Sequence, residues 1–214
     1  MNLVHKYWFF KEALSPKMCD DIINHALSQK NREQVAFTGD AKFKRDLVKK
    51  PPTKKELKDL RKTRNSNIIW LDDRWVYDAI QPFVHVANKN ADWNFDWDYS
   101  EQCQFTRYSK GQFYDWHCDS WDRPYTEEGP TQGKIRKLSV TVSLSDPKDY
   151  TGGELEFDYR NKHPKEKGGL VKCTEIAPRG SVVVFPSFVW HRVCPVKRGT
   201  RYSLVMWNLG RPFK

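Results

Sequence analysis

The clearest pattern along the chain is a strict alternation of apolar and polar residues in its second half. Leu138, Val140, Val142 and Leu144 alternate with serine and threonine residues. Because successive residues of a strand point to opposite faces, this pattern predicts a half-buried β-strand. Further strands are expected at Cys103–Tyr108, Gln112–Trp116, Glu154–Phe157, Ser181–Phe185, Phe188–Val193 and Thr200–Leu209. About eight short strands separated by turn residues are typical of a barrel or a jelly roll.

Residues 1–100 show a different pattern, which predicts mostly helices. Ser15 followed by Pro16 has the composition of a helix N-cap and first turn. A second helix is expected from near Asp73 to about Asn88. Between the helices lies a polar, basic stretch, residues 42–64. It predicts a loop, either a surface loop without a role or a flap that faces a substrate.

Composition narrows the class of protein. The chain has 214 residues, of which 38% are hydrophobic and 30% charged, and this suits one globular domain. No run of about 18 apolar residues is present, so we expect neither a membrane span nor a secretory signal. The five cysteines form no Cys-x-x-Cys motif, which predicts reduced thiols in a cytoplasm. The net charge of +10 is compatible with a nucleic-acid partner, an acidic substrate or a solvated surface.

A candidate metal site lies at Tyr114-Asp115-Trp116-His117-Cys118-Asp119. Residues two apart in a strand share a face, so His117 and Asp119 can reach one ion. His191, in a second strand-like segment, is the best candidate for a third ligand. Two histidines and a carboxylate on one octahedral face suit Fe(II) and leave three positions for a chelating co-substrate and oxygen.

Ten residues beyond His191, Arg201 opens a segment in which Ser203, Val205 and Trp207 share its face. An arginine on the inner face of a barrel is a costly buried charge without a partner. A ligand carboxylate held by the planar guanidinium is a suitable partner. The alternative is an arginine at a strand end, paired with a surface acid.

With His117, Asp119, His191 and Arg201 in this order, the chain resembles the 2-oxoglutarate/Fe(II)-dependent oxygenases. The resemblance is closest to the prolyl-4-hydroxylase-like branch of bacteria and phages. Three further motifs carry the resemblance: Tyr108-Ser109-Lys110-Gly111-Gln112-Phe113-Tyr114, Gly152-Gly153-Glu154-Leu155, and Gly180-Ser181 to Phe185-Pro186. It covers about residues 100–210 well and the amino-terminal part only loosely.

The resemblance implies a double-stranded β-helix, a mainly β jelly roll with supporting helices, α+β overall. One domain, 1–214, is then expected, with helical support and a basic 42–64 loop over 1–100 and a jelly-roll catalytic core over 101–210. Fe(II) would be the cofactor, 2-oxoglutarate and O2 the co-substrates, and ascorbate a stimulant. His117, Asp119 and His191 would hold the metal, and no other side chain would be catalytic.

The resemblance also implies the co-substrate contacts. Arg201 would bind the far carboxylate of 2-oxoglutarate, and Tyr108 would donate a hydrogen bond to the co-substrate. Thr141 and Ser143 lie on the polar strand face that would look inward. In several prolyl hydroxylases a tyrosine stands where Ser143 stands here. The presence of Asp119 favours hydroxylation, because related halogenases lack this carboxylate.

The expected reaction is hydroxylation of a prolyl residue in a peptide or protein, by a chain encoded by a bacterium or phage. Trp116, Trp121 and Trp190 would line the mouth of the pocket or pack within the barrel. Three alternatives remain: a nucleic-acid demethylase of the AlkB type, a small-molecule or free amino-acid hydroxylase, and a jelly-roll binding module without catalysis. The AlkB branch carries a second arginine where Trp207 stands in this chain.

Overall fold

The computed structural model describes residues 3–36, 53–120, 123–160 and 169–213. The helices are α1 (Pro16–Ser28), α3 (Lys54–Thr63) and α4 (Arg74–Asn90), with a short 3-10 helix η1 (Lys30–Arg32). The strands are β1 (Trp8–Phe10), β2 (Gln34–Val35), β3 (Arg64–Asn65), β4 (Asn67–Leu71), β5 (Tyr99–Ser100), β6 (Cys103–Tyr108), β7 (Phe113–His117), β8 (Ile135–Ser143), β9 (Thr151–Gly152), β10 (Leu155–Asp158), β11 (Leu170–Lys172), β12 (Val182–Pro186), β13 (Trp190–Val193), β14 (Val196–Arg198) and β15 (Arg201–Gly210). No helix in the described ranges is long and apolar enough to cross a membrane.

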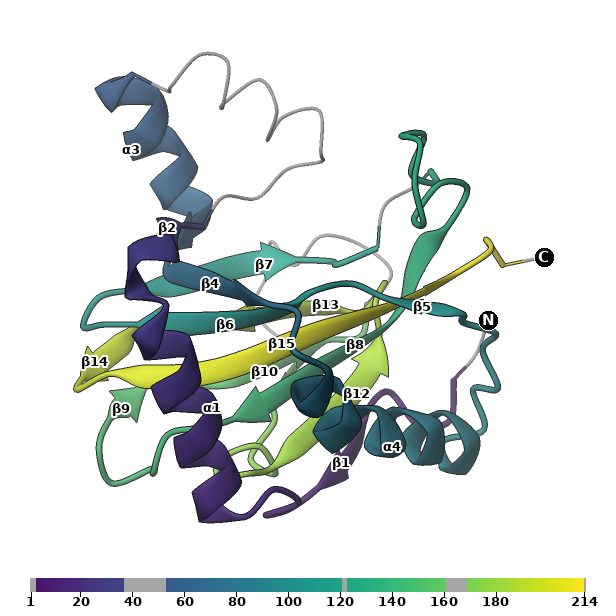
Figure 1. Ribbon diagram of the computed structural model, residues 1–214, viewed down its shortest axis with the longest axis horizontal. Coiled ribbons are helices and arrows are strands. Elements are labelled where there is room, and N and C mark those ends of the chain that lie inside the picture. The colour runs from purple at the N-terminus through teal and green to yellow at the C-terminus, as the bar shows by residue number, and fades with distance from the viewer. Residues whose placement is uncertain (1–2, 37–52, 121–122, 161–168, 214) are drawn as a thin grey trace.

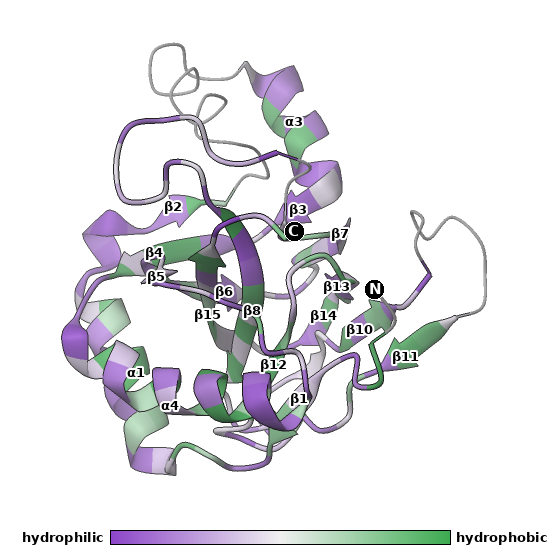
Figure 2. Cartoon of the chain, turned by 90° about the vertical axis from the view of Figure 1, so that its right-hand side faces the viewer, coloured by the Kyte–Doolittle hydropathy of each residue, from purple (hydrophilic) through white to green (hydrophobic). Residues whose placement is uncertain are grey.

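The strands form two antiparallel sheets that face each other and a small ribbon (Figure 1). The main sheet has the order β1-β12-β8-β15-β6-β4-β2, and β5 pairs with β15. The smaller sheet has the order β11-β10-β13-β7-β3, and β14 pairs with β9. Figure 2 shows the two sheets as separate layers, with β6, β8 and β15 in one and β7, β10 and β13 in the other. The predicted jelly roll with supporting helices is confirmed.

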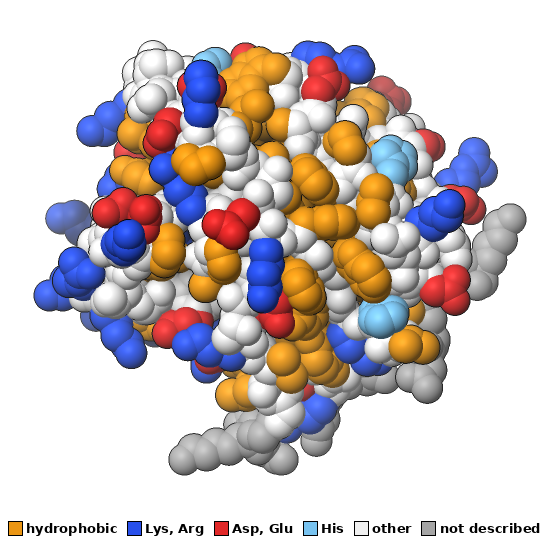
Figure 3. All heavy atoms as spheres, turned by 90° about the horizontal axis from the view of Figure 1, so that it is seen from below, with side chains coloured by type: hydrophobic (Ala, Val, Ile, Leu, Met, Phe, Trp, Pro, Cys, Tyr) orange, Lys and Arg blue, Asp and Glu red, His pale blue; other side chains and the backbone are white. Residues whose placement is uncertain are grey.

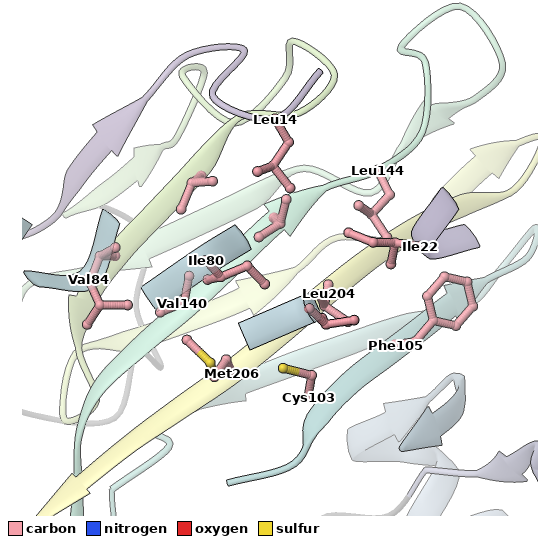
Figure 4. Packing of buried hydrophobic residues seen from close by; sticks show 14 of the residues in the cluster. Leu14, Ile22, Ile80, Val84, Cys103, Phe105, Val140, Leu144, Leu204 and Met206 are labelled. Carbon is pink, nitrogen blue, oxygen red and sulfur yellow. The ribbon is translucent and has the colours of Figure 1, made fainter. Parts of the chain in front are cut away.

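Helices α1 and α4 cover the outer face of the main sheet, and the largest core lies between them and that sheet (Figure 4). Ile22 of α1 and Ile80 of α4 pack there against the apolar face of β8 and β15. That core includes Leu14, Val84, Cys103, Phe105, Val140, Leu144, Leu204 and Met206. The polar face of β8 is buried as well, because it lines the space between the sheets. The prediction of a half-buried strand was therefore wrong: β8 is covered on both faces.

Local signals located helices α1 and α4 well. The Ser15 side chain accepts a hydrogen bond from the Met18 backbone N–H at 3.2 Å, and Pro16 is the first residue of α1. This is the N-cap geometry that the sequence predicted. The second expected helix is α4, which begins at Arg74 and ends at Asn90.

Two expectations about residues 1–100 need correction. Residues 42–52 of the expected basic loop lie outside the described residues, but residues 54–63 form helix α3. This helix forms because Thr53 and Glu56 make a reciprocal capping box at its start. Moreover, strands β1, β2, β4 and β5 join the main sheet, so this half of the chain builds the sheet as well as supporting it.

Candidate metal centre and co-substrate pocket

The three side chains predicted as metal ligands meet between the two sheets. His117 ends β7, Asp119 lies two residues further, and His191 lies directly opposite His117 on the neighbouring strand β13. His117 Nε2 lies 3.7 Å from Asp119 Oδ1, and His191 Nε2 lies 3.5 Å from Asp119 Oδ2. One donor atom of each residue lies within 4.8 Å of the others, and all three side chains are buried. Donors that bind one ion at about 2.1 Å on an octahedral face lie about 3 Å apart, so this spacing suits a single metal ion.

Backbone carbonyl groups orient both imidazole rings. His117 Nδ1 lies 2.7 Å from the Asp115 carbonyl oxygen, and His191 Nδ1 lies 3.0 Å from the Val189 carbonyl oxygen. A carbonyl oxygen only accepts hydrogen bonds, so each Nδ1 carries the proton and donates it. In a neutral ring with this tautomer Nε2 carries the lone pair, and the Nε2 atoms of both rings lie on the side of Asp119. This is the usual support of metal-binding histidines by a second ring of hydrogen bonds.

Asp119 is held by serine residues of the main sheet and of the turn after β12. Ser139 Oγ donates to Asp119 Oδ2 at 2.7 Å and lies 2.8 Å from Ser187 Oγ. The Asp119 backbone N–H donates to the Ser187 carbonyl oxygen at 2.8 Å. Through Ser139 on β8, the carboxylate is tied to the sheet opposite the two histidines. These contacts orient the carboxylate toward the site.

The electrostatics of the site favour a cation. Burial raises the pKa of the Asp119 carboxyl, but electrostatic interactions with His191, His117 and Arg136 and the Ser139 hydrogen bond outweigh it and lower the pKa to about 2. Burial, with added repulsion from His191, lowers the pKa of His117 well below its ordinary value. An ionised carboxylate and a neutral imidazole therefore face the site at neutral pH. Together with His191 they match the donor set of a non-haem Fe(II) centre.

Arg201, the first residue of β15, lies buried in the pocket beside this centre. Its guanidinium donates to Ser203 Oγ at 3.2 Å and lies 5.5 Å from the ring centroid of Tyr108, its partner on β6. No carboxylate within the described ranges forms an ion pair with it. Because a buried charge without a partner costs several kcal/mol, an anionic ligand is the expected partner. The predicted alternative, a strand-end arginine paired with a surface acid, finds no support.

The other predicted site residues divide into two groups. Tyr108 and Thr141 line the pocket, and burial raises the pKa of the Tyr108 hydroxyl, so it remains a hydrogen-bond donor. Ser143 is buried on the same strand as Thr141 but is not among the residues that line the pocket. Its role as a co-substrate contact stays a prediction.

Two of the three tryptophans predicted at the mouth are described by the structure, and neither lines the pocket. Trp116 lies under the guanidinium of Arg192, 4.8 Å from the ring centroid, and Arg192 pairs with Glu156. Trp190 is half-buried and is absent from the pocket lining, and Trp121 lies outside the described residues. The proposed role of these residues in substrate access stays a prediction.

Two strand irregularities lie near side chains of the pocket or their neighbours. A register shift between β7 and β13 turns Tyr114 to the same side as His117, and the two rings stack with centroids 3.4 Å apart. A second register shift occurs between β8 and β15, where Leu209 pairs with Arg136. The guanidinium of Arg136 lies 3.8 Å from the ring centroid of Trp207. Trp207 lines this pocket, and its buried Nε1 has no hydrogen-bond partner in the described ranges, so a water or a ligand is the expected acceptor.

Sequence reasoning missed Arg64 and Gln104 in the pocket lining. Arg64 is buried, donates to Ser66 Oγ at 3.1 Å, and lies 4.3 Å from the ring centroid of Tyr114. It belongs to the two-residue strand β3, which follows directly after α3. The basic composition of its surroundings suggested a loop, so no signal in the sequence distinguished it from the exposed cations nearby.

Comparison with known proteins places this site in a family. Residues 103–208 match the model of the 2OG-Fe(II) oxygenase superfamily. Through these residues, just under half of its length, the chain is similar to the 2OG-Fe(II) oxygenase superfamily. The matched segment contains His117, Asp119, His191 and Arg201, and it confirms the resemblance inferred from the sequence.

Curated bacterial relatives are PKHD-type hydroxylases. One from Xanthomonas axonopodis pv. citri (strain 306) is 35% identical over 105 residues, which cover 48% of this chain and 41% of the relative. PKHD-type hydroxylase YbiX from Escherichia coli O1:K1 / APEC is 38% identical over 105 residues, covering 48% and 40%. The match thus spans about two fifths of the length of these relatives.

Solved prolyl hydroxylases share the fold. A viral collagen prolyl hydroxylase from Paramecium Bursaria Chlorella virus-1, in its 2OG complex, gives a TM-score of 0.62 at 22% identity and covers 97% of both chains. A Pseudomonas putida prolyl-4-hydroxylase gives 0.62 at 19% identity, covering 98% of this chain and 95% of that one. A Trichoplax adhaerens prolyl hydroxylase, in complex with a hypoxia inducible factor peptide fragment, gives 0.63 at 16% identity, covering 96% and 84%.

Proposed function

We propose that this chain is a 2-oxoglutarate- and Fe(II)-dependent dioxygenase that hydroxylates a prolyl residue in a peptide or protein. The observation that carries the proposal is the meeting of His117, Asp119 and His191 in one buried pocket with the unpaired guanidinium of Arg201. A metal-binding triad beside a buried cation fits a metal-chelating dicarboxylic acid better than it fits a neutral ligand. The PKHD-type hydroxylase relatives and the prolyl hydroxylase neighbours support the prolyl substrate.

Each group in the pocket has a role in this proposal. His117, Asp119 and His191 hold Fe(II), which supplies oxygen activation coupled to the oxidative decarboxylation of 2-oxoglutarate to succinate. Arg201 binds the far carboxylate of 2-oxoglutarate, with its guanidinium oriented by Ser203. Tyr108 donates a hydrogen bond from its protonated hydroxyl to the same ligand. No side chain has to transfer a proton.

Apolar side chains from both sheets complete the proposed pocket. Leu155, Phe185, Val193 and Val205 line it. These groups exclude water from the reacting centre, which protects reactive species from side reactions and strengthens the contacts of Arg201 and Asp119. The pocket therefore combines a few oriented polar groups with an apolar wall, as small-molecule sites usually do.

The proposal is tested by turnover with ferrous iron, 2-oxoglutarate and oxygen. Succinate is measured together with the mass of a panel of prolyl peptides, free amino acids and methylated oligonucleotides. The expected result is succinate release coupled to the gain of one oxygen atom by a prolyl peptide. The variants His191→Ala and Arg201→Ala are expected to abolish this coupled product. Turnover of only oligonucleotides or free amino acids would support the alternative substrates, and no succinate with any substrate would refute the oxygenase.

A further inference from the structure

The cations of helix α3 gather on one side of that helix. They are Lys54, Lys55, Lys58, Arg61 and Lys62, and all of them are exposed. With about 100° of rotation per residue, they occupy an arc of roughly 120° around the helix. The half-buried Leu57 and Leu60 occupy the adjoining arc, and Glu56 and Asp59 occupy the remaining one. This set of cations is called the α3 basic face.

Most of the α3 basic face is not neutralised. Lys62 pairs with Asp59 at 2.6 Å, and Glu56 accepts from the Thr53 backbone at the start of the helix. The other cations have no carboxylate partner among the described residues: Lys54, Lys55, Lys58 and Arg61. Both acidic side chains of the helix are therefore engaged within it, and these cations keep their charge for a partner.

The α3 basic face leads directly to the pocket. Arg64 follows the helix, donates its backbone N–H to the Leu60 carbonyl oxygen, and places its guanidinium in the pocket lining beside Tyr114. Helix α3 contacts both β3 and β7, and β7 carries His117. Figure 1 shows α3 projecting beyond the sheets on the side of β7. A chain bound along this helix would thus reach the metal centre.

The opposite side of the molecule has a different charge distribution. Figure 3 views the molecule from below, away from α3, and there basic side chains stand among acidic ones beside a band of hydrophobic residues. On α1, for example, Lys17 pairs with Asp21 at 2.7 Å. The run of cations without carboxylate partners on α3 differs from this mixed face of the molecule.

We infer that the α3 basic face binds an acidic segment of the protein substrate next to the target residue, an inference that rests on the proposed function. From Lys54 to Arg61 the helix rises about 10 Å, the length of about three residues of extended chain. Opposite charge along this length orients the substrate and speeds its encounter with the pocket. Single-stranded nucleic acid is the weaker candidate, because α3 carries no aromatic side chain on which bases stack.

The test compares three prolyl peptides that differ only in their flanks, which carry Glu, Gln or Lys on either side of the target. The variant Lys54→Glu/Lys58→Glu reverses two charges of the α3 basic face. Its matched control, Lys17→Glu/Lys89→Glu, makes the same change in net charge on exposed residues of α1 and α4. For the wild type and the control, kcat/KM is expected to be about tenfold higher for the Glu peptide than for the Gln peptide, falling with added salt. The α3 variant is expected to lose this preference and to favour the Lys peptide.

Fluorescence anisotropy with the same peptides and a labelled oligonucleotide reports binding without turnover. Tighter binding of the Glu peptide that is lost only in the α3 variant supports the inference, whether or not the peptide is hydroxylated. Absence of hydroxylation of every prolyl peptide would refute the proposed function but not this inference. The gain of Lys-peptide binding by the α3 variant shows that it is folded. Equal binding of all three peptides by the wild type would overturn the inference, as would tighter binding of the oligonucleotide than of the Glu peptide.

Discussion

Replacing Gly153 by alanine tests how the protein positions the Arg201 side chain. Gly153 has a φ of +67°, and a Cβ placed on it would lie 2.8 Å from Arg201 Cδ and 3.1 Å from Val196 Cγ2. Carbon atoms in contact are normally about 3.5–4.0 Å apart, so the Arg201 side chain has to retreat by about 1 Å. Because it projects into the pocket, this movement carries the guanidinium away from the place where a carboxylate would bind.

The size of the effect follows from what the guanidinium contributes. A hydrogen bond to a charged group contributes about 1.5–3 kcal/mol, so the loss of one such contact corresponds to a factor of about 10–150. We therefore expect Gly153→Ala to raise the KM and the Kd for 2-oxoglutarate by about tenfold to a hundredfold. The affinity for ferrous iron is expected to change little, because the three metal-binding side chains are not displaced.

The control separates this displacement from backbone strain. Gly133 has a φ of +73° and nothing within 4 Å of a Cβ placed on it. Gly133→Ala therefore carries a similar penalty of about 1–2 kcal/mol for a left-handed alanine but moves no neighbour. Both variants are expected to unfold at lower temperature, and only Gly153→Ala is expected to weaken 2-oxoglutarate binding, measured by initial rates and by calorimetry. An unchanged Kd in Gly153→Ala, or an equal rise in Gly133→Ala, would refute this account of Arg201.

Three further predictions concern the metal centre and the core. Ser139→Ala is expected to lower the affinity for ferrous iron by about tenfold in an anaerobic titration, because it removes the hydroxyl that orients Asp119. The control Ser100→Ala removes a hydroxyl far from the site and is expected to leave this affinity unchanged. Because the pKa of His117 is lowered in the folded protein, the unfolded chain takes up a proton at acidic pH that the folded chain does not. The metal-free protein is therefore expected to lose stability in thermal unfolding as the pH falls below about 6.5, the ordinary pKa of histidine. The variant His117→Asn is expected to lose less stability over the same pH range. Ile80→Ala is expected to cost about 2–5 kcal/mol in denaturant unfolding, because Ile80 is buried between α4 and the main sheet; a cost below 1 kcal/mol would contradict this packing.

The chemistry of the site was easier to predict than the shape of the pocket. His117 and Asp119 are two residues apart, and Arg201 opens a predicted strand, so their residue types and spacing already pointed to a metal and an anion. The contribution of Ser187 to the Asp119 network depends on a turn that folds beside the metal site. No pattern within one strand contains such a contact.

Two local irregularities show why the remaining pocket residues were not found. Strict alternation separates Tyr114 from His117, but the register shift in β7 puts both rings on one side. Arg64 stands at the end of a helix that the basic composition of residues 42–64 concealed, although the Thr53–Glu56 capping box was present in the sequence. Register shifts depend on pairing with other strands, so sequence periodicity alone does not reveal them.

The polar interior of this jelly roll is possible because the main core lies elsewhere. Helices α1 and α4 bury the outer face of the main sheet, and the hydrophobic cluster there includes residues of β8 and β15. The inner face of the same strands then need not supply most of the apolar burial that stabilises the fold. Serine, threonine and arginine side chains occupy it at positions that alternate with that cluster. Ser139 is buried there and donates to Asp119, and Arg201 is buried there next to the place where the proposed 2-oxoglutarate carboxylate would bind. The same two strands thus stabilise the fold with one face and build the site with the other.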